Sequence, residues 1–197
     1  MTDIRELHRR ALQVTVDLVN QVRPDQLALP TPCAEWDLGQ LLAHMTGQNH
    51  GFAAAARGER QDESVFLPHP VDADPAGLHA AGAADLAAAF AEDGMLERDV
   101  WLVEIKAGPV FPGSAAVSFH LVDSVAHAWD VAEALGLPVA FDHDVLQVTL
   151  AIARRVPDGQ VRLEPGTAFA PSLAAEPRAG ALGEILALLG RTPDWRG

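Results

Sequence analysis

Residues 114–135 read SAAVSFHLVDSVAHAWDVAEAL, and this stretch decides the fold. Ser114 can cap a helix at its start, and Gly136, with Pro138 behind it, can end that helix. We therefore expect one long helix from residue 114 to about residue 135. It is the most informative segment of the chain, because it carries acidic and histidine side chains among its apolar residues.

Further helices are expected on both sides of this one. Apolar side chains recur at steps of three and four through residues 3–22, with Thr2 as a cap. Asp37 can cap a second helix that continues to about Arg57. The remaining expected helices cover residues 83–95, 142–155 and, briefly, 182–189. Because there is little strand signal between them, the sequence predicts an all-α bundle.

The segments between the helices predict loops and one hairpin. Residues 58–80 mix Gly, Pro, Asp and His without periodicity and predict a long loop, of the kind that forms functional rims or lids. Residues 96–113 predict a short extended piece or hairpin at the end of the bundle. We expect a bundle over residues 1–156, followed by an irregular C-terminal extension over residues 157–197 that packs on it.

The composition disfavours several kinds of partner. With 27 acidic against 14 basic residues, the formal net charge of −13 opposes binding to nucleic acid or to an anionic membrane surface. No run reaches the roughly 18 apolar residues of a spanning helix, and residues 1–10 are too charged for a secretory signal. The single cysteine, Cys33, predicts no internal disulfide, and we expect its thiol to pack as a small apolar group. These features favour a cytoplasmic protein.

One face of the helix at residues 114–135 carries a candidate set of metal ligands. Asp123 and His127 stand four residues apart, so a carboxylate oxygen and an imidazole nitrogen can converge on one ion. His120 and Asp130 extend the same row by three residues to either side. His120 is a candidate catalytic base, fourth ligand or outer partner, and Asp130 can accept the other N–H of the His127 ring.

A third ligand has to come from another helix, and His44 is the candidate. It lies among apolar neighbours in the expected helix that begins after Asp37. Gly47 and Gly51 follow it, and glycine inside a helix costs roughly 1 kcal/mol against alanine, so the pair indicates a need for space or close backbone approach. We expect a cleft beside His44.

Two structural alternatives compete with a metal site. A single histidine in an amphipathic helix is usually a hydrogen-bonded core or rim residue, and an Asp/His pair at this spacing often only stabilises a helix surface. Burial separates these interpretations, because a carboxylate among apolar neighbours has to be paired or bound to a metal.

Four motifs together resemble a known family. They are TPCAEWD (31–37), LLAHMTGQ (41–48), DSVAHAWDVA (123–132) and ALLGRTPDW (187–195). They are similar to actinobacterial DinB-like proteins, in particular the group related to the N-terminal domain of mycothiol-dependent maleylpyruvate isomerase. The resemblance implies a DinB-like four-helix bundle that binds zinc or nickel through a histidine, a carboxylate and a histidine. These positions fall on His44, Asp123 and His127, and the isomerase has glutamate where Asp123 stands.

The resemblance also implies a class of reaction. A metal-bound thiol or water loses its proton near neutral pH and can attack a small substrate in an isomerisation, transfer or hydrolysis. Mycothiol is the thiol of the isomerase, so it is a candidate cosubstrate here. The region after the bundle is too short for the second domain of the isomerase. The alternative is a non-catalytic bundle that binds a small ligand or protein partner, with a structural or vacant metal site; a homodimer is left open.

Overall fold

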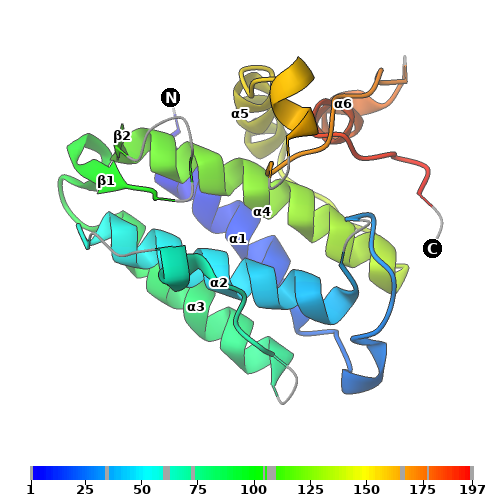
Figure 1. Cartoon of the computed structure of the whole chain (residues 1–197), viewed down its shortest axis with the longest axis horizontal. Helices are drawn as coiled ribbons and strands as arrows, with labels where there is room; N and C mark the ends of the chain where they lie inside the picture. Colours follow the sequence, from blue (N-terminus) through cyan, green and yellow to red (C-terminus); the bar gives the residue numbers. More distant parts are fainter. Residues whose placement is uncertain are drawn as a thin grey trace.

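Four long helices form a bundle, and two shorter helices lie on one side of it (Figure 1). The long helices are α1 (Ile4–Val19), α2 (Leu38–Ala56), α3 (Pro75–Ala91) and α4 (Gly113–Leu135), and the shorter ones are α5 (His143–Ala153) and α6 (Gly180–Leu188). This computed structural model describes residues 2–33, 36–59, 63–71, 74–103, 105, 110–164, 167–176 and 178–195. The predicted all-α bundle with a C-terminal extension is confirmed.

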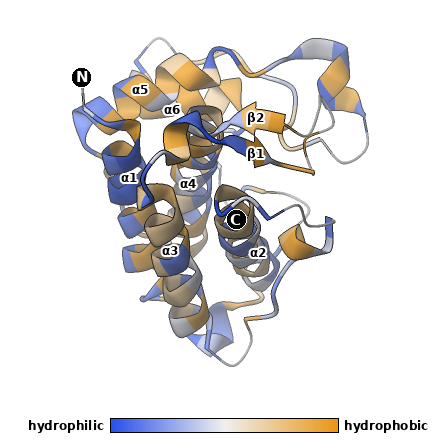
Figure 2. Cartoon of the chain, turned by 90° about the vertical axis from the view of Figure 1, so that its left-hand side faces the viewer, coloured by the Kyte–Doolittle hydropathy of each residue, from blue (hydrophilic) through white to orange (hydrophobic). Residues whose placement is uncertain are grey.

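The long helices enclose a common interior. Both α1 and α2 pack against α3 and α4. In the two views at right angles, α5 and α6 lie beside α4 on the side away from α3 (Figures 1 and 2). Two buried residues of α4, Leu121 and Val125, share an apolar cluster with Ile185 and Leu189, and α6 packs directly against α5, which in turn packs against α4.

The helices carry hydrophilic as well as hydrophobic residues (Figure 2). In α1 the buried residues include Leu7, Ala11 and Leu18, which belong to the predicted apolar stripe. Among the helices that the structure describes, none is both long and apolar enough to cross a membrane.

The start of α1 differs from the prediction. Its cap is Asp3 and not Thr2: the Asp3 carboxylate accepts a hydrogen bond from the backbone N–H of Arg5 at 2.9 Å. A carboxylate at this position also interacts favourably with the positive end of the helix dipole, which a threonine hydroxyl does less well. By contrast, the predicted cap of α2 is confirmed, because Asp37 and Gln40 form a reciprocal capping box.

The predicted cap of α4 is also wrong, by two residues. The helix begins at Gly113, and its cap position is Pro112, which has no side-chain hydrogen bond to offer. The N–H of Gly113 instead donates to the carbonyl of Arg98 at 2.8 Å. A tertiary contact therefore takes the place of the Ser114 hydroxyl.

The predicted loop at residues 58–80 ends earlier than expected. The helix α3 starts at Pro75, more than two turns before the predicted start at residue 83, and ends at Ala91. Asp74 caps it by accepting from the N–H of Gly77 at 2.9 Å, and proline is well suited to the first helical position. An Asp-Pro pair is thus the signal for this start. A short 3₁₀ helix, Glu63–Phe66, lies within the remaining connection.

A short hairpin closes one end of the bundle, as predicted. The strands β1 (Asp99–Trp101) and β2 (Val110–Pro112) pair antiparallel, with Val100 opposite Phe111. Residues 104 and 106–109 of the predicted hairpin lie outside the described residues. Because β2 runs directly into α4, the hairpin fixes where that helix begins.

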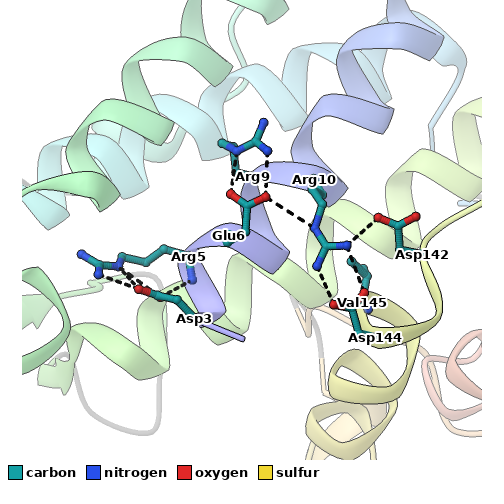
Figure 3. Close-up of polar contacts among 8 residues, drawn as sticks. All are labelled: Asp3, Arg5, Glu6, Arg9, Arg10, Asp142, Asp144 and Val145. Carbon is teal, nitrogen blue, oxygen red and sulfur yellow. Dashed lines mark hydrogen bonds and ion pairs between the residues drawn. The ribbon is translucent and has the colours of Figure 1, made fainter. Parts of the chain in front are cut away.

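Arg10 ties the bundle to the first residues of α5. Its guanidinium donates to the carboxylates of Asp142 and Asp144, while Glu6 lies one turn away on α1 (Figure 3). These groups are partly exposed, so each pair contributes at most about 1 kcal/mol to stability. The contact serves mainly to set the position of α5 against α1.

Gly47 and Gly51 of α2 make room for a neighbouring segment of the chain. A Cβ added at Gly47 would lie 2.4 Å from the carbonyl oxygen of Leu67, and one at Gly51 would lie 2.2 Å from the ring of Phe66. The space at both glycines is filled, so the close backbone approach is confirmed, and a cleft beside His44 stays a prediction. The glycines let the segment around Phe66 lie directly on α2.

Replacing Gly47 with alanine is expected to lower the free energy of unfolding by roughly 1–3 kcal/mol, because the new methyl group overlaps a backbone carbonyl. Gly39→Ala is the matched control in the same helix, since its Cβ would be 3.4 Å from its nearest neighbours. This variant should be neutral or gain up to about 1 kcal/mol in helix propensity. Urea unfolding of both variants checks this, and equal stability of the two would contradict the packing described.

Candidate metal centre

Asp123 and His127 face each other across one turn of α4. The Nε2 atom of His127 lies 3.3 Å from Oδ1 of Asp123. The His127 side chain is only 5% exposed and that of Asp123 is 23% exposed, so the pair is set into the protein and still reaches its surface. A surface pair that merely supports the helix would be more open, which disfavours that alternative.

His44 approaches the same point from α2. Its ring centroid lies 5.2 Å from that of His127, with the two ring planes at 78°. One ligand atom from each of His44, Asp123 and His127 can be chosen so that all three lie within 4.8 Å of one another. Among the described residues, no other group of three or more His, Cys, Asp or Glu side chains converges in this way.

This donor set suits a divalent metal ion. Two nitrogens and one carboxylate oxygen are typical of catalytic zinc sites, in which open positions remain for water or substrate. Ligands placed about 2.0–2.1 Å from a tetrahedral ion are roughly 3.3 Å apart, and the separation of Asp123 and His127 is 3.3 Å. The residues present therefore fit a metal ion, although Asp123 is shorter than glutamate.

The electrostatics of the three ligands differ. Burial and the nearby His127 lower the pKa of His44 to about 4, so its ring is neutral at pH 7. Burial also lowers the pKa of His127, but Asp123 and Asp130 outweigh burial and raise it to about 9. Conversely, burial raises the pKa of Asp123, and the charge of His127 overcomes this and holds it below its usual range. Without an ion, His127 thus carries a proton that a metal has to displace.

Asp130 and Arg191 support His127 from behind. The Nδ1–H group of His127 donates to Oδ2 of Asp130 at 2.9 Å, and Arg191 lies against the same carboxylate. Burial raises the pKa of Asp130, but His127 and Arg191 more than compensate and lower it. An ionised partner on Nδ1 leaves Nε2 as the atom that faces Asp123, which is the arrangement found behind metal-bound histidines.

Trp36 covers His44. The two ring centroids are 4.5 Å apart, with the planes tilted by 34°. The connection between α1 and α2 places this indole, because the hydroxyl of Thr31 donates to the carbonyls of Cys33 and Trp36 at 3.1 and 2.8 Å. Cys33 is half-buried there and is not a member of the converging ligand group.

His120 lies deeper in the bundle than the three ligands. Its Nδ1 atom is 2.9 Å from Nε2 of His8 and 3.1 Å from Oγ of Ser124, and the ring packs edge-on against Phe52. Only 2% of the residue is exposed, and its Nε2 atom has no hydrogen-bond partner among the described residues. His120 does not belong to the converging ligand group. The catalytic role assigned to it from sequence stays a prediction.

Four further histidines, His50, His69, His79 and His143, lie off this face or in predicted loops by sequence, which favours solvated rings, and His69 and His143 are exposed. The prediction is wrong for His79, which lies in α3 and is only 1% exposed. Its Nε2 atom is 2.8 Å from the hydroxyl of Thr15. His50 stacks on His69 with ring centroids 4.6 Å apart. His143 is exposed at the start of α5.

Sequence reasoning missed two members of this region. Arg191 entered only as part of a motif, and His8 was not singled out. For His8 a signal was available, because it follows Leu7 on the apolar stripe of α1. For Arg191 none was available, since its partner Asp130 is 61 residues earlier in the chain.

Comparison with known proteins identifies similar sequences. The model of the family "Mycothiol maleylpyruvate isomerase N-terminal domain" matches residues 8–132. Two uncharacterized proteins of Mycobacterium tuberculosis, from strains CDC 1551 and H37Rv, are each 32% identical over 188 residues, which is 94% of this chain and 96% of theirs. The matched family region contains all three candidate ligands.

Comparison with solved structures agrees with the bundle. The crystal structure of the mycothiol-dependent maleylpyruvate isomerase superimposes with a TM-score of 0.55 at 17% identity, and that of a mutant of the same enzyme with 0.58 at 16%. Each match covers 76% of this chain and 66% of the isomerase chain. At this identity the likeness shows a shared fold, over a part of the isomerase.

Proposed function

This chain belongs to the family of the mycothiol maleylpyruvate isomerase N-terminal domain, and from that membership we propose that it is a metal-dependent enzyme. It activates a low-molecular-weight thiol, with mycothiol as the first candidate, or a water molecule. The activated group attacks a small electrophilic substrate in an isomerisation, transfer or hydrolysis. The observation that carries the proposal is the convergence of His44, Asp123 and His127 from two helices within 4.8 Å.

Each residue has a distinct part in this proposal. His44 offers a neutral nitrogen from α2, and Asp123 offers an ionised oxygen from α4. His127 offers Nε2, because its other nitrogen is held by Asp130. A divalent ion bound to these atoms would lower the pKa of a coordinated thiol or water and make it nucleophilic near neutral pH. Trp36, stacked on His44, shields one side of the site from solvent.

Cobalt substitution tests the proposal. The chain reconstituted with Co²⁺ should show the visible absorption of a four- or five-coordinate site, and a low-molecular-weight thiol should add a thiolate-to-cobalt band in the near ultraviolet. His44→Ala should lose both signals. A cobalt site that gives no thiolate band with any thiol would remove thiol activation and leave activation of water.

Zinc affinity is expected to rise about tenfold per pH unit between pH 6 and pH 8, because His127 has to lose its proton before it binds. The pKa of His127 is about 9 and that of His44 about 4, so between pH 6 and pH 8 the His127 ring carries a proton that zinc has to displace, whereas the His44 ring is already neutral. Zinc titrations against a competing chelator at several pH values check this. Binding should also release about one proton per ion at pH 7, and an affinity that stays flat with pH would contradict the assignment.

A second candidate function is a non-catalytic bundle in which the metal site is vacant. One observation favours it: Asp123, protonated His127, Asp130 and Arg191 form a chain of alternating charges that is balanced without an ion. Under this alternative the purified chain would bind neither zinc nor cobalt at micromolar concentration. The metal titrations above therefore separate the two candidates.

A further inference from the structure

A buried ion pair joins the end of the chain to the middle of α4. Arg191 Nη2 lies 2.9 Å from Oδ2 of Asp130, and Arg191 Nε lies 3.4 Å from Oδ1. Asp130 is 0% exposed and Arg191 is 6% exposed. Removing two charges from water costs several kcal/mol per ion, so a buried pair is weak evidence for added stability. We therefore look for a role of this ion pair other than stabilising the fold.

The geometry of the pair connects it to His127. The Oδ2 atom that binds Arg191 is the same atom that accepts from Nδ1 of His127, at 2.9 Å. Two donors on one oxygen, with a third contact on the other oxygen, leave the carboxylate little freedom to rotate. The His127 ring is thereby held with Nε2 toward Asp123.

The position of Arg191 depends in turn on α6. Its backbone N–H donates to the carbonyl of Leu186 at 2.9 Å, and its Nη1 donates to that of Leu189 at 3.2 Å. Gly190, just before it, has a φ of 76°, a conformation that favours glycine. The turn at Gly190 thereby places the guanidinium of Arg191 next to Asp130 of α4, near which α6 lies (Figure 1).

We infer that Arg191 is a positioning residue of the metal centre, so that the C-terminal turn after α6 is a working part of the site. The inference rests on the proposed function in one respect, namely that His127 Nε2 is a metal ligand. It adds that ligand orientation is controlled by a segment outside the four long helices. Loss of Arg191 should loosen Asp130 and His127 without removing any ligand.

Arg162 provides a matched control. It is also a 6% exposed arginine of the C-terminal extension, and it also contacts the end of α6, where its Nη1 donates to the carbonyl of Leu188 at 2.6 Å. Its other contacts are backbone carbonyls and the carboxylate of Asp158, with none to Asp130. Arg162→Met should therefore reduce stability as Arg191→Met does, but without acting on His127.

The experiment compares zinc affinity and thermal stability of Arg191→Met, Arg191→Lys and Arg162→Met in the full chain. Outer partners of metal-bound histidines typically change affinity by about 10–100-fold, so we expect a loss of that size in Arg191→Met. Arg191→Lys should retain part of the affinity, because it keeps the charge but loses the two-pronged contact. Arg162→Met should keep the wild-type affinity. Equal losses in Arg191→Met and Arg162→Met would overturn the inference and leave Arg191 a structural residue.

A second measurement does not need metal. In NMR spectra of the metal-free chain, the Nδ1 proton of His127 should be shifted downfield and exchange slowly, because Asp130 holds it. This signal should disappear in Arg191→Met and persist in Arg162→Met. If the wild-type chain binds no zinc, the proposed function fails, while the NMR result still decides the inference. A Nδ1 signal unchanged by Arg191→Met would overturn it.

Discussion

Replacing His44 or His127 with alanine is expected to weaken zinc binding at least about 100-fold, at or beyond the upper end of the loss seen for an outer partner. Each substitution removes one of only three protein ligands, and no other His, Cys, Asp or Glu of the described residues converges on the same point. Two remaining ligands cannot hold the ion firmly. The check is the metal content of protein purified without chelators, followed by zinc titration of each variant.

His50→Ala is the control for this prediction. His50 lies on the same helix as His44 but stacks on His69 outside the ligand group. Its zinc affinity should equal that of the wild type, and circular dichroism should show that all three variants keep their helices. Unchanged metal content in both His44→Ala and His127→Ala would remove the proposed site.

Acidification from pH 6.5 to pH 4 is expected to lower the free energy of unfolding by several kcal/mol. Burial lowers the pKa of His79 and of His120 from 6.5 to about 4. Between these pH values the unfolded chain takes up a proton on each ring and the native bundle does not, so stability is present above pH 6.5 and is lost as the pH falls. At about 1.4 kcal/mol per pKa unit, each ring accounts for roughly 3 kcal/mol.

Urea unfolding at a series of pH values between 7 and 4.5 measures this slope. The raised pKa of His127 does not add to it, because that stabilisation is fully present below pH 6.5. His79→Leu should reduce the slope by up to about 1.4 kcal/mol per pH unit, the effect of one proton. Identical slopes for His79→Leu and the wild type would show that His79 is not held neutral in the fold.

The fold could be predicted from sequence largely where local signals agree. The long helix α4 ends at Leu135, and Gly136 follows it with a φ of 65°. The glycine alone was therefore sufficient to predict where this helix ends. The start of α3 was misplaced because the prediction rested on the helix propensity of its Ala-rich part and not on the capping pair Asp74 and Pro75. The glycines of α2 indicated close approach correctly, but only the structure shows that the backbone at Leu67 uses the space.

The three candidate ligands could be predicted from the sequence, but the residues that contact them could not. Asp123 and His127 share a helix, so their spacing alone places them on one face, and His44 was the candidate from a second helix that the resemblance then supported. Arg191 could not be found in this way, because its contact with Asp130 depends on how α6 docks on α4. His120 was singled out by the same spacing argument, yet the rotation of α4 directs it to His8 in the interior.

The central claim is that His44, Asp123 and His127 bind one metal ion. Its most direct test is an anomalous difference map from crystals of the full chain grown with zinc. We predict a single strong peak about 2.0–2.2 Å from a ring nitrogen of His44, a carboxylate oxygen of Asp123 and Nε2 of His127. A map with no peak between α2 and α4, or with zinc bound only elsewhere, would contradict it.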